Sequence, residues 1–503
     1  MGTETSLVSR INVKRIMEED LFEEKHCNDL PTVRIVKAEL NNFKSVKYGE
    51  IDFYCGKKFV PYGTRSDILG IYGQNGSGKT AFIDALYILK CLLEGSRVPE
   101  SIADCIMVGA DFATLSFGFQ LQYRDGRIRN VVYKFSLRAE EVQDRPDKVL
   151  EFNEGARKAK LTKKIRVFNE VISMSGDFYG KRQKLQPVID TSDPKTPFAS
   201  VAKQKEFLGK NNAEVALQVN KQLAYEKSRS FIFMRKTLSL FKERGNYSEF
   251  FQVLLELNLY AEGYLHVINT RSSGLIRMNV AIAFHTRYGS FPIDVGGPTD
   301  FPTEVYELLE SQYNDVSAVI SELIPGVKLG IKKISDVLLN KGEPGIRAEF
   351  VVERNGVSMP LRYESDGERR LISVLSLLIN AYNDQSCTVA IDEFDAGIFE
   401  YLLGEILQIL EDSGKGQFIF TSHNLRPLEV IDNKFLYFTT TDPNHRYTQL
   451  KHIGKTNNLR NIYFREIILG GEEDIYNTTK RYKIVRALRK AYKSPLDSGS
   501  EEE

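Results

Sequence analysis

The stretch that most constrains the fold is residues 68–89, ILGIYGQNGSGKTAFIDALYIL. Its apolar run at 68–72 predicts a buried strand, and the largely apolar segment after residue 80 predicts a helix. Between them lies GQNGSGKT, which fits the pattern G-x-x-x-x-G-K-[ST]. In that setting, backbone N–H groups and a helix N-terminus can surround phosphate oxygens. The sequence therefore predicts a phosphate-binding loop.

The residue types in this loop indicate which ligand it takes. Lys79 is expected to reach the β- and γ-phosphates, and the Thr80 hydroxyl to bind Mg²⁺. ATP and Mg²⁺ are therefore the expected cofactors. The expected nucleotide-binding residues of the loop are Gly73, Gln74, Asn75, Gly76, Ser77, Gly78, Lys79 and Thr80.

Two later strands end in side chains that suit nucleotide hydrolysis. The apolar run 388–391 ends at Asp392 and Glu393, where an Asp can hold Mg²⁺ and a Glu can polarise the attacking water. The run 417–421 ends at Ser422 and His423, and His423 could sense the γ-phosphate and orient the water. We therefore predict Glu393, His423 and Lys79 as catalytic residues, and Thr80 and Asp392 as metal ligands.

A Ser-x-Gly turn precedes the apolar helix expected at 371–382. Ser365 and Gly367 could form a second anion site, because backbone N–H groups and the helix dipole favour negative charge there. Ser365 could equally be an ordinary helix N-cap. The residues alone leave both interpretations open.

The chain order predicts an α/β fold divided by an insertion. We expect an N-terminal extension at 1–32, a first lobe at 33–145, a mainly helical insertion at 146–324, a second lobe at 325–470 and a helical tail at 471–503. Strand-like runs lie at 32–40, 51–54, 112–123 and 128–137, and the last two are joined by a turn containing Asp125-Gly126 that predicts a hairpin. Residues 289–302 are rich in Gly and Pro, which predicts a loop.

Composition limits the classes of ligand and the cellular compartment that we expect for this protein. Lys plus Arg number 68 against 67 for Asp plus Glu, which argues against a general polyanion binder. The five cysteines form no C-x-x-C pair, as expected of reduced thiols in a cytosol. No apolar run reaches the roughly 20 residues of a membrane span, so we expect a cytoplasmic protein.

A local basic segment is the exception to the balanced charge. Residues 157–166 carry six basic and no acidic residues, and Lys181, Arg182 and Lys184 extend the segment. It could contact DNA or another polyanion, or it could be a solvated face.

The order of these motifs resembles an ABC-type ATPase head of the SMC and RecF-like family. The resemblance covers roughly residues 33–140 and 325–455, and it includes Leu40-Asn41-Asn42-Phe43-Lys44-Ser45-Val46 before the nucleotide site. It implies a mixed sheet with flanking helices and an antiparallel β subdomain. It also implies a dimer of heads, in which Ser365 and Gly367 contact the γ-phosphate held by the other subunit and residues 395–397 form the D-loop at the same interface. The signature departs from L-S-G-G-Q, and Gln120 and Gln122 are both weak candidates for the Q-loop glutamine.

The modest insertion and the closing segment 470–480 look like a narrower group, the stand-alone ATPases of bacterial anti-phage systems such as AriA of PARIS and PtuA of Septu. That resemblance implies a slow, regulatory ATPase whose nucleotide-dependent head dimer, or a higher homo-oligomer, controls an effector protein encoded nearby. The alternative is an SMC- or RecF-like DNA-binding ATPase in DNA repair or maintenance. A self-contained nuclease is expected to need more than the 80 residues that follow His423.

Overall fold

The computed structural model describes most of the chain. The described residues are 30–53, 67–143, 161–193, 196–209, 213–244, 248–269, 281–286, 289–294, 296–339, 342–450, 459–463 and 481–492. The expected extension up to residue 29, the first part of the basic segment (157–160) and the closing segment 470–480 lie outside these residues.

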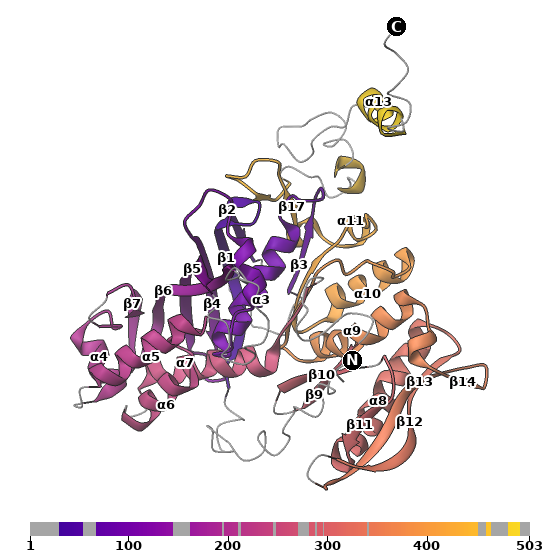
Figure 1. Cartoon of the computed structure of the whole chain (residues 1–503), viewed down its shortest axis with the longest axis horizontal. Coiled ribbons are helices and arrows are strands. Elements are labelled where there is room, and N and C mark those ends of the chain that lie inside the picture. The colour runs from indigo at the N-terminus through magenta and orange to yellow at the C-terminus, as the bar shows by residue number, and fades with distance from the viewer. Residues whose placement is uncertain are drawn as a thin grey trace, which may run out of the picture.

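A six-stranded, mostly parallel sheet forms the centre of the molecule (Figure 1). Five neighbouring strands run parallel and a sixth, short strand pairs antiparallel at one edge. The three central strands are short, largely apolar and buried, as a parallel sheet covered on both faces requires. In spatial order the strands are β18 (Tyr447–Thr448), β17 (Leu436–Thr439), β3 (Asp67–Tyr72), β16 (Gln417–Thr421), β15 (Thr388–Ile391) and β8 (Leu265–Ile268).

A second six-stranded sheet is wholly antiparallel. In spatial order its strands are β2 (Val46–Asp52), β1 (Thr32–Phe43), β4 (Ala113–Gln122), β5 (Ile128–Gln143), β6 (Leu161–Phe178) and β7 (Lys181–Asp190). Three of them, β1, β4 and β5, follow the expected runs, whereas β2 begins at Val46, well before the run expected at 51–54. The predicted hairpin joins β4 and β5 through Asp125 and Gly126.

Helix α3 (Lys79–Leu93) lies between the two sheets (Figure 1). It is apolar on most sides, and its buried residues share one hydrophobic core with the antiparallel sheet and with Ala390 and Ile419 of the central sheet. A buried side chain also joins the sheets directly. Gln417 exchanges hydrogen bonds with the main chain of Ile35, at 2.9 and 3.3 Å, and donates to Asp67 Oδ2 at 2.7 Å.

The opposite face of the central sheet carries a second core. Helices α9 (Asp366–Asn383) and α10 (Glu400–Ser413) pack there, together with a small sheet and the helix that covers it. The small sheet and its helix are β11 (Thr299–Pro302), β13 (Pro344–Arg354), β12 (Val327–Leu338), β14 (Val357–Pro360) and α8 (Thr303–Leu323).

The region expected to form a mainly helical insertion at 146–324 contains strands as well as helices. Helices do occur there: α4 (Val201–Leu208), α5 (Glu214–Glu226), α6 (Arg235–Arg244) and α7 (Glu249–Leu259), followed by a short π-helix at Tyr260–Tyr264. The same region also supplies β6 and β7 to the antiparallel sheet and β8 to the central sheet. Strand pairing along β5 gives β6 the backbone partners that its polar, basic sequence did not indicate.

The predicted loop at 289–302 is wrong. It contains β10 (Gly289–Asp294), which pairs with β9 (Ala281–Thr286), and β11, which pairs with β13. Proline is tolerated at such positions when the strand lies at an edge or pairs over a short length. The remaining described helices are short or isolated: α11 (Pro427–Val430), α13 (Arg481–Tyr492), a helical turn at 459–463 and 3-10 turns at Glu100–Cys105, Leu361–Tyr363 and Asn433–Phe435.

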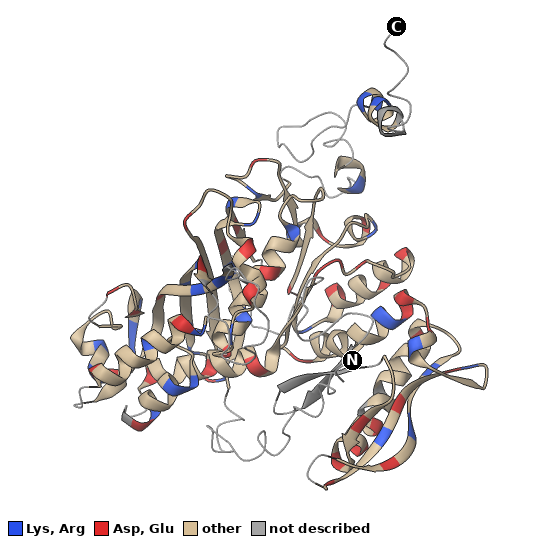
Figure 2. Ribbon diagram, viewed as in Figure 1, with Lys and Arg blue, Asp and Glu red and all other residues tan. Residues whose placement is uncertain are grey.

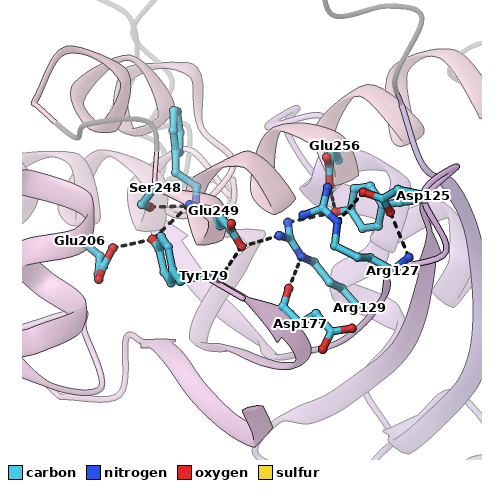
Figure 3. Close-up of polar contacts among 11 residues, drawn as sticks. Asp125, Arg127, Arg129, Asp177, Tyr179, Glu206, Ser248, Glu249 and Glu256 are labelled. Atoms are coloured by element: carbon cyan, nitrogen blue, oxygen red, sulfur yellow. Dashed lines mark hydrogen bonds and ion pairs between the residues drawn. The ribbon is translucent and has the colours of Figure 1, made fainter. Parts of the chain in front are cut away.

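A buried arginine ties the helices of the inserted region to the antiparallel sheet (Figure 3). Arg129 of β5, 1% exposed, donates to the Asp177 carbonyl at 2.9 Å, to the Tyr123 hydroxyl at 3.2 Å and to Glu249 Oε2 at 2.5 Å. The Tyr123 hydroxyl in turn donates to Glu256 on α7 at 2.6 Å. Burial raises the pKa of Glu256 to about 7.

None of the helices in the described ranges is long and apolar enough to cross a membrane.

Candidate active site

Three neighbouring parallel strands end at one edge of the central sheet. The register pairs Ile71 of β3 with Thr421 of β16, and Phe420 of β16 with Ile391 of β15. Because the carboxyl ends of parallel strands meet at the same edge, the segments after these strands converge there. The sequence predicted each segment separately, and the strand order with β16 in the middle brings all three together.

The predicted phosphate-binding loop closes tightly over the end of β3. Gly73 has a φ of 149°, and a Cβ there would lie 1.7 Å from Thr439 Oγ1, so only glycine fits. Ser77 and Gly78 are buried, whereas Asn75 and Gly76 are exposed at the tip. The loop therefore keeps a fixed backbone with its tip open to solvent.

Lys79 folds back over this loop. Its Nζ donates to the carbonyl oxygens of Gly73 at 2.7 Å and Gln74 at 3.1 Å, and the residue is only 6% exposed. Burial lowers the pKa of Lys79 to about 8, while the carboxylates of Asp392 and Glu393 oppose the shift. The ammonium group thus sits beside the loop with only carbonyl oxygens as hydrogen-bond acceptors, which a phosphate could replace.

Thr80 and Asp392 face each other across the strand ends. The Thr80 hydroxyl lies 3.5 Å from Asp392 Oδ1, and Thr421 donates to the same oxygen at 2.6 Å. Asp392 is fully buried. A hydroxyl and a carboxylate are oxygen ligands of the kind that Mg²⁺ prefers, so these two residues fit the predicted metal site. Thr421 was missed in the sequence, because a threonine inside a buried strand carries no signal of its own.

Glu393 and His423 lie at the same edge. Glu393 is half-buried, has a left-handed backbone with φ 49°, and its N–H donates to Thr421 Oγ1 at 2.8 Å. The backbone N–H groups of His423 and Asn424 donate to Asp395 Oδ2 at 3.1 and 2.9 Å. Burial of the ring and the nearby Lys79 charge lower the pKa of His423, which favours the neutral imidazole.

Ser365 is the N-cap of α9. Its hydroxyl accepts from the Glu368 N–H at 3.2 Å, which is an N-cap bond, and donates to Glu368 Oε2 at 3.0 Å. The helix-cap interpretation is thus realised, while the anion site at Ser365 and Gly367 stays a prediction. A Cβ on Gly367 would lie 2.0 Å from the carbonyl oxygen of Gly397, so the turn and the predicted D-loop of one chain touch through their backbones.

The Ser-x-Gly turn and the phosphate-binding loop open helices on opposite faces of the central sheet. Alternate residues of β15 and β16 belong to different cores: Ala390 and Ile419 to the core of α3, and Val389, Ile391, Phe418 and Phe420 to the core of α9. Because successive side chains of a strand point to opposite faces, α3 and α9 lie on opposite faces too. Ser365 itself is exposed.

The two weak Q-loop candidates bond within the antiparallel sheet. Gln120 donates to Asn130 Oδ1 at 3.2 Å, and Gln122 donates to Gln120 Oε1 at 3.2 Å. These contacts give neither glutamine a role at the nucleotide site.

The basic segment is less available than its sequence suggested. Arg166 is buried and donates to Glu140 and to the carbonyls of Tyr225 and Glu226. Lys163 pairs with Asp104. The register sets Lys163 and Lys164 opposite Glu141 and Glu140, and acidic and basic residues are interspersed over this part of the ribbon (Figure 2). These pairings favour the solvated face over a polyanion contact.

Two family models match the chain. One, described as an AAA domain, matches residues 37–227. The other, described as an AAA domain, putative AbiEii toxin, Type IV TA system, matches residues 272–429. No curated protein matches the chain.

Solved structures resemble the chain over most of its length at low identity. An SMC head bound to the C-terminal winged-helix domain of ScpA is 14% identical, covers 83% of this chain and 98% of its own, and has a TM-score of 0.38. The SMC head domain from Thermotoga maritima is 14% identical, with coverages of 83% and 100% and a TM-score of 0.33. The recombination mediator RecF with ATP is 14% identical, with coverages of 84% and 100% and a TM-score of 0.34.

The strand order of the central sheet and the geometry of the phosphate-binding loop define the fold. The predicted α/β P-loop ATPase fold, with mixed sheets and flanking helices, is confirmed. With partial matches to two AAA-domain models, over residues 37–227 and 272–429, the chain has the fold of a P-loop ATPase.

Proposed function

We propose that this protein hydrolyses ATP with Mg²⁺ at sites shared between two copies of the chain. The observation that carries the proposal is the convergence of three strand ends, which sets Lys79, the Thr80–Asp392 pair and Glu393 around one loop. Lys79 would bind the β- and γ-phosphates, and Thr80 and Asp392 would hold Mg²⁺. Bound Mg²⁺ would supply charge neutralisation on the phosphates.

The remaining residues would act on the attacking water. Glu393 would polarise it as general base, and the neutral His423 would orient it and contact the γ-phosphate. Asp395 supports this arrangement, because it fixes the backbone of His423 and Asn424 through two hydrogen bonds.

The position of the Ser-x-Gly turn supports a shared site. Its helix lies on the sheet face opposite to α3, and its Ser365 hydroxyl is exposed rather than packed against the chain's own loop. A two-fold dimer would place this turn of each copy on the nucleotide of the other and so form two identical sites. ATP would then favour the closed dimer, because only ATP offers a γ-phosphate to both copies.

Complementation between two defective variants tests the shared site. Ser365→Arg should block turnover and spare ATP binding, and Lys79→Ala should block ATP binding. Mixed dimers should regain activity at one site, because one copy keeps an intact loop and the other an intact turn. If the mixture stays as inactive as each variant alone while mixed dimers demonstrably form, the shared site is wrong and each chain acts alone.

The biological role follows from the narrower resemblance. The nucleotide state of a cytoplasmic homodimer, or of a higher homo-oligomer, would control an effector protein in bacterial anti-phage defence. The second matched family is described as a putative toxin of a type IV toxin–antitoxin system, and this supports a role in which a harmful activity is held under control. Affinity capture on Glu393→Gln protein, with and without ATP, tests this role. An effector recovered in only one nucleotide state is the expected result, and a partner set that ignores ATP would contradict it.

A further inference from the structure

Arg370 is a buried arginine whose hydrogen bonds go to the main chain of the candidate active site. It lies on α9, five residues after Ser365, and is 8% exposed. Its guanidinium donates to the carbonyl oxygen of Asp392 at 3.1 Å and to that of Glu393. In the described part of the chain it forms no salt bridge within 4 Å. The carboxylates of Glu393, Asp395 and Asp392 attract the buried guanidinium electrostatically, while its hydrogen bonds go to the main chain that carries two of them.

The carbonyl that Arg370 holds belongs to a strained residue. Glu393 has φ 49°, a conformation that costs a non-glycine residue on the order of 1 kcal/mol. Its peptide groups are fixed from both sides: the N–H donates to Thr421 at 2.8 Å, and the carbonyl accepts from Arg370 and from the Ala396 N–H at 3.0 Å. This backbone sets the direction in which the Glu393 carboxylate leaves the strand.

The same helix end carries the Ser-x-Gly turn. Gly367 touches the carbonyl of Gly397, and one turn further along α9 is Arg370. A shift of the start of α9 therefore moves both the D-loop contact and the clamp on Glu393. No flexible segment separates them, since residues 366–383 form one continuous helix.

We propose that Arg370 is a positioning residue that couples the Ser-x-Gly turn to Glu393. When the turn engages the γ-phosphate held by a second copy, α9 is fixed, and Arg370 fixes the Glu393 backbone so that its carboxylate meets the water in the chain's own site. Each site would then hydrolyse ATP only when the other is also closed. This inference rests on the shared site proposed above.

The chain offers a matched control next door. Arg369 lies in the same helical turn, and its guanidinium pairs with the exposed side chain of Asp366 in the Ser-x-Gly turn instead of reaching the main chain of Asp392 and Glu393. Arg369→Ala and Arg370→Ala remove the same charge from the same helix. Only the second removes the clamp.

The experiment measures kcat, KM for ATP, ATP-driven dimerisation and thermal stability of both variants and of Arg370→Lys. For Arg370→Ala we expect kcat to fall about 10²-fold, the scale of a roughly 1 Å misplacement, with KM within about twofold and dimerisation retained. Arg369→Ala should stay within about threefold of the wild type. Arg370→Lys, which keeps the charge and a single donor nitrogen, should recover part of the lost kcat even if Arg370→Ala proves unstable.

The outcomes separate the two proposals. If the wild type neither dimerises with ATP nor hydrolyses it, the proposed function fails. If the wild type does both and Arg370→Ala matches Arg369→Ala in kcat, the positioning role alone is refuted. A parallel loss of kcat, ATP affinity and thermal stability in Arg370→Ala, with no recovery in Arg370→Lys, would make Arg370 a structural residue and would also refute it.

Discussion

Replacing Gly367 by alanine should stop turnover while leaving the nucleotide bound. The added Cβ would lie 2.0 Å from the Gly397 carbonyl oxygen and 2.9 Å from its carbon, where about 3 Å is the closest approach that real Cβ atoms make. The turn and the D-loop must therefore separate by about 1 Å. A displacement of that size in a positioning element costs about 10²-fold in rate. The helix that follows the phosphate-binding loop packs on the opposite sheet face from α9, so ATP affinity should change little.

Phosphate release, titration with a fluorescent ATP analogue and thermal denaturation together test this prediction. Gly263→Ala is the control, because a Cβ at that helical glycine meets nothing within 4 Å. If Gly367 did not touch Gly397, the alanine of Gly367→Ala would instead stabilise the protein by roughly 0.4–1 kcal/mol. A Gly367→Ala protein that is as active as the wild type would refute the backbone contact and its role in turnover.

Three further predictions concern single side chains. Lys79→Ala should abolish ATP binding with the fold intact, and an unchanged titration with an ATP analogue would contradict this. Glu393→Gln should keep ATP binding but lower turnover about 10²-fold or more, and His423→Ala should lower it less, both read from phosphate release. Glu256→Gln should alter the pH dependence of stability. The folded pKa of Glu256, about 7, exceeds the ordinary value of 4.5, so its contribution to stability is complete below pH 4.5 and is lost as pH rises through 7. The 2.5-unit gap corresponds to about 3 kcal/mol, so denaturant titrations should show the variant gaining about that much over the wild type between pH 4.5 and 8. A difference that is the same at both pH values would contradict it.

Several residues of the candidate site could be predicted from short sequence patterns. The glycines of residues 73–78 and the following Lys79 and Thr80 specify a loop whose conformation is set by neighbours in sequence, so the phosphate-binding loop could be predicted from the sequence alone. Asp392 and His423 were found because they follow apolar runs that end abruptly. Each of these signals lies within about ten residues.

The features that the sequence did not predict depend on partners far away in the chain. The basic run of β6 suggested an exposed surface, but Arg166 is buried because β5 and α5 supply a carboxylate and two carbonyls from far away in the sequence. Strand β8 was hidden in a segment of helical appearance, because a four-residue strand is specified by its parallel pairing with β15 and not by its own periodicity. Such a short strand forms because of its backbone hydrogen-bond partners, and these partners lie far away in the sequence.

The sequence by itself determined the chemistry available to this protein: a phosphate-binding loop, two acidic residues and a histidine at strand ends, and a Ser-x-Gly turn before a helix. The tertiary structure decided which of these groups meet. The placement of β16 between β3 and β15 brings Thr421 between Asp392 and Glu393, and the packing of α9 on the far sheet face sends Arg370 back to the same backbone. Side chains and carbonyls separated by tens to hundreds of residues become neighbours only when the sheet order and the helix faces are fixed together, which no local pattern encodes.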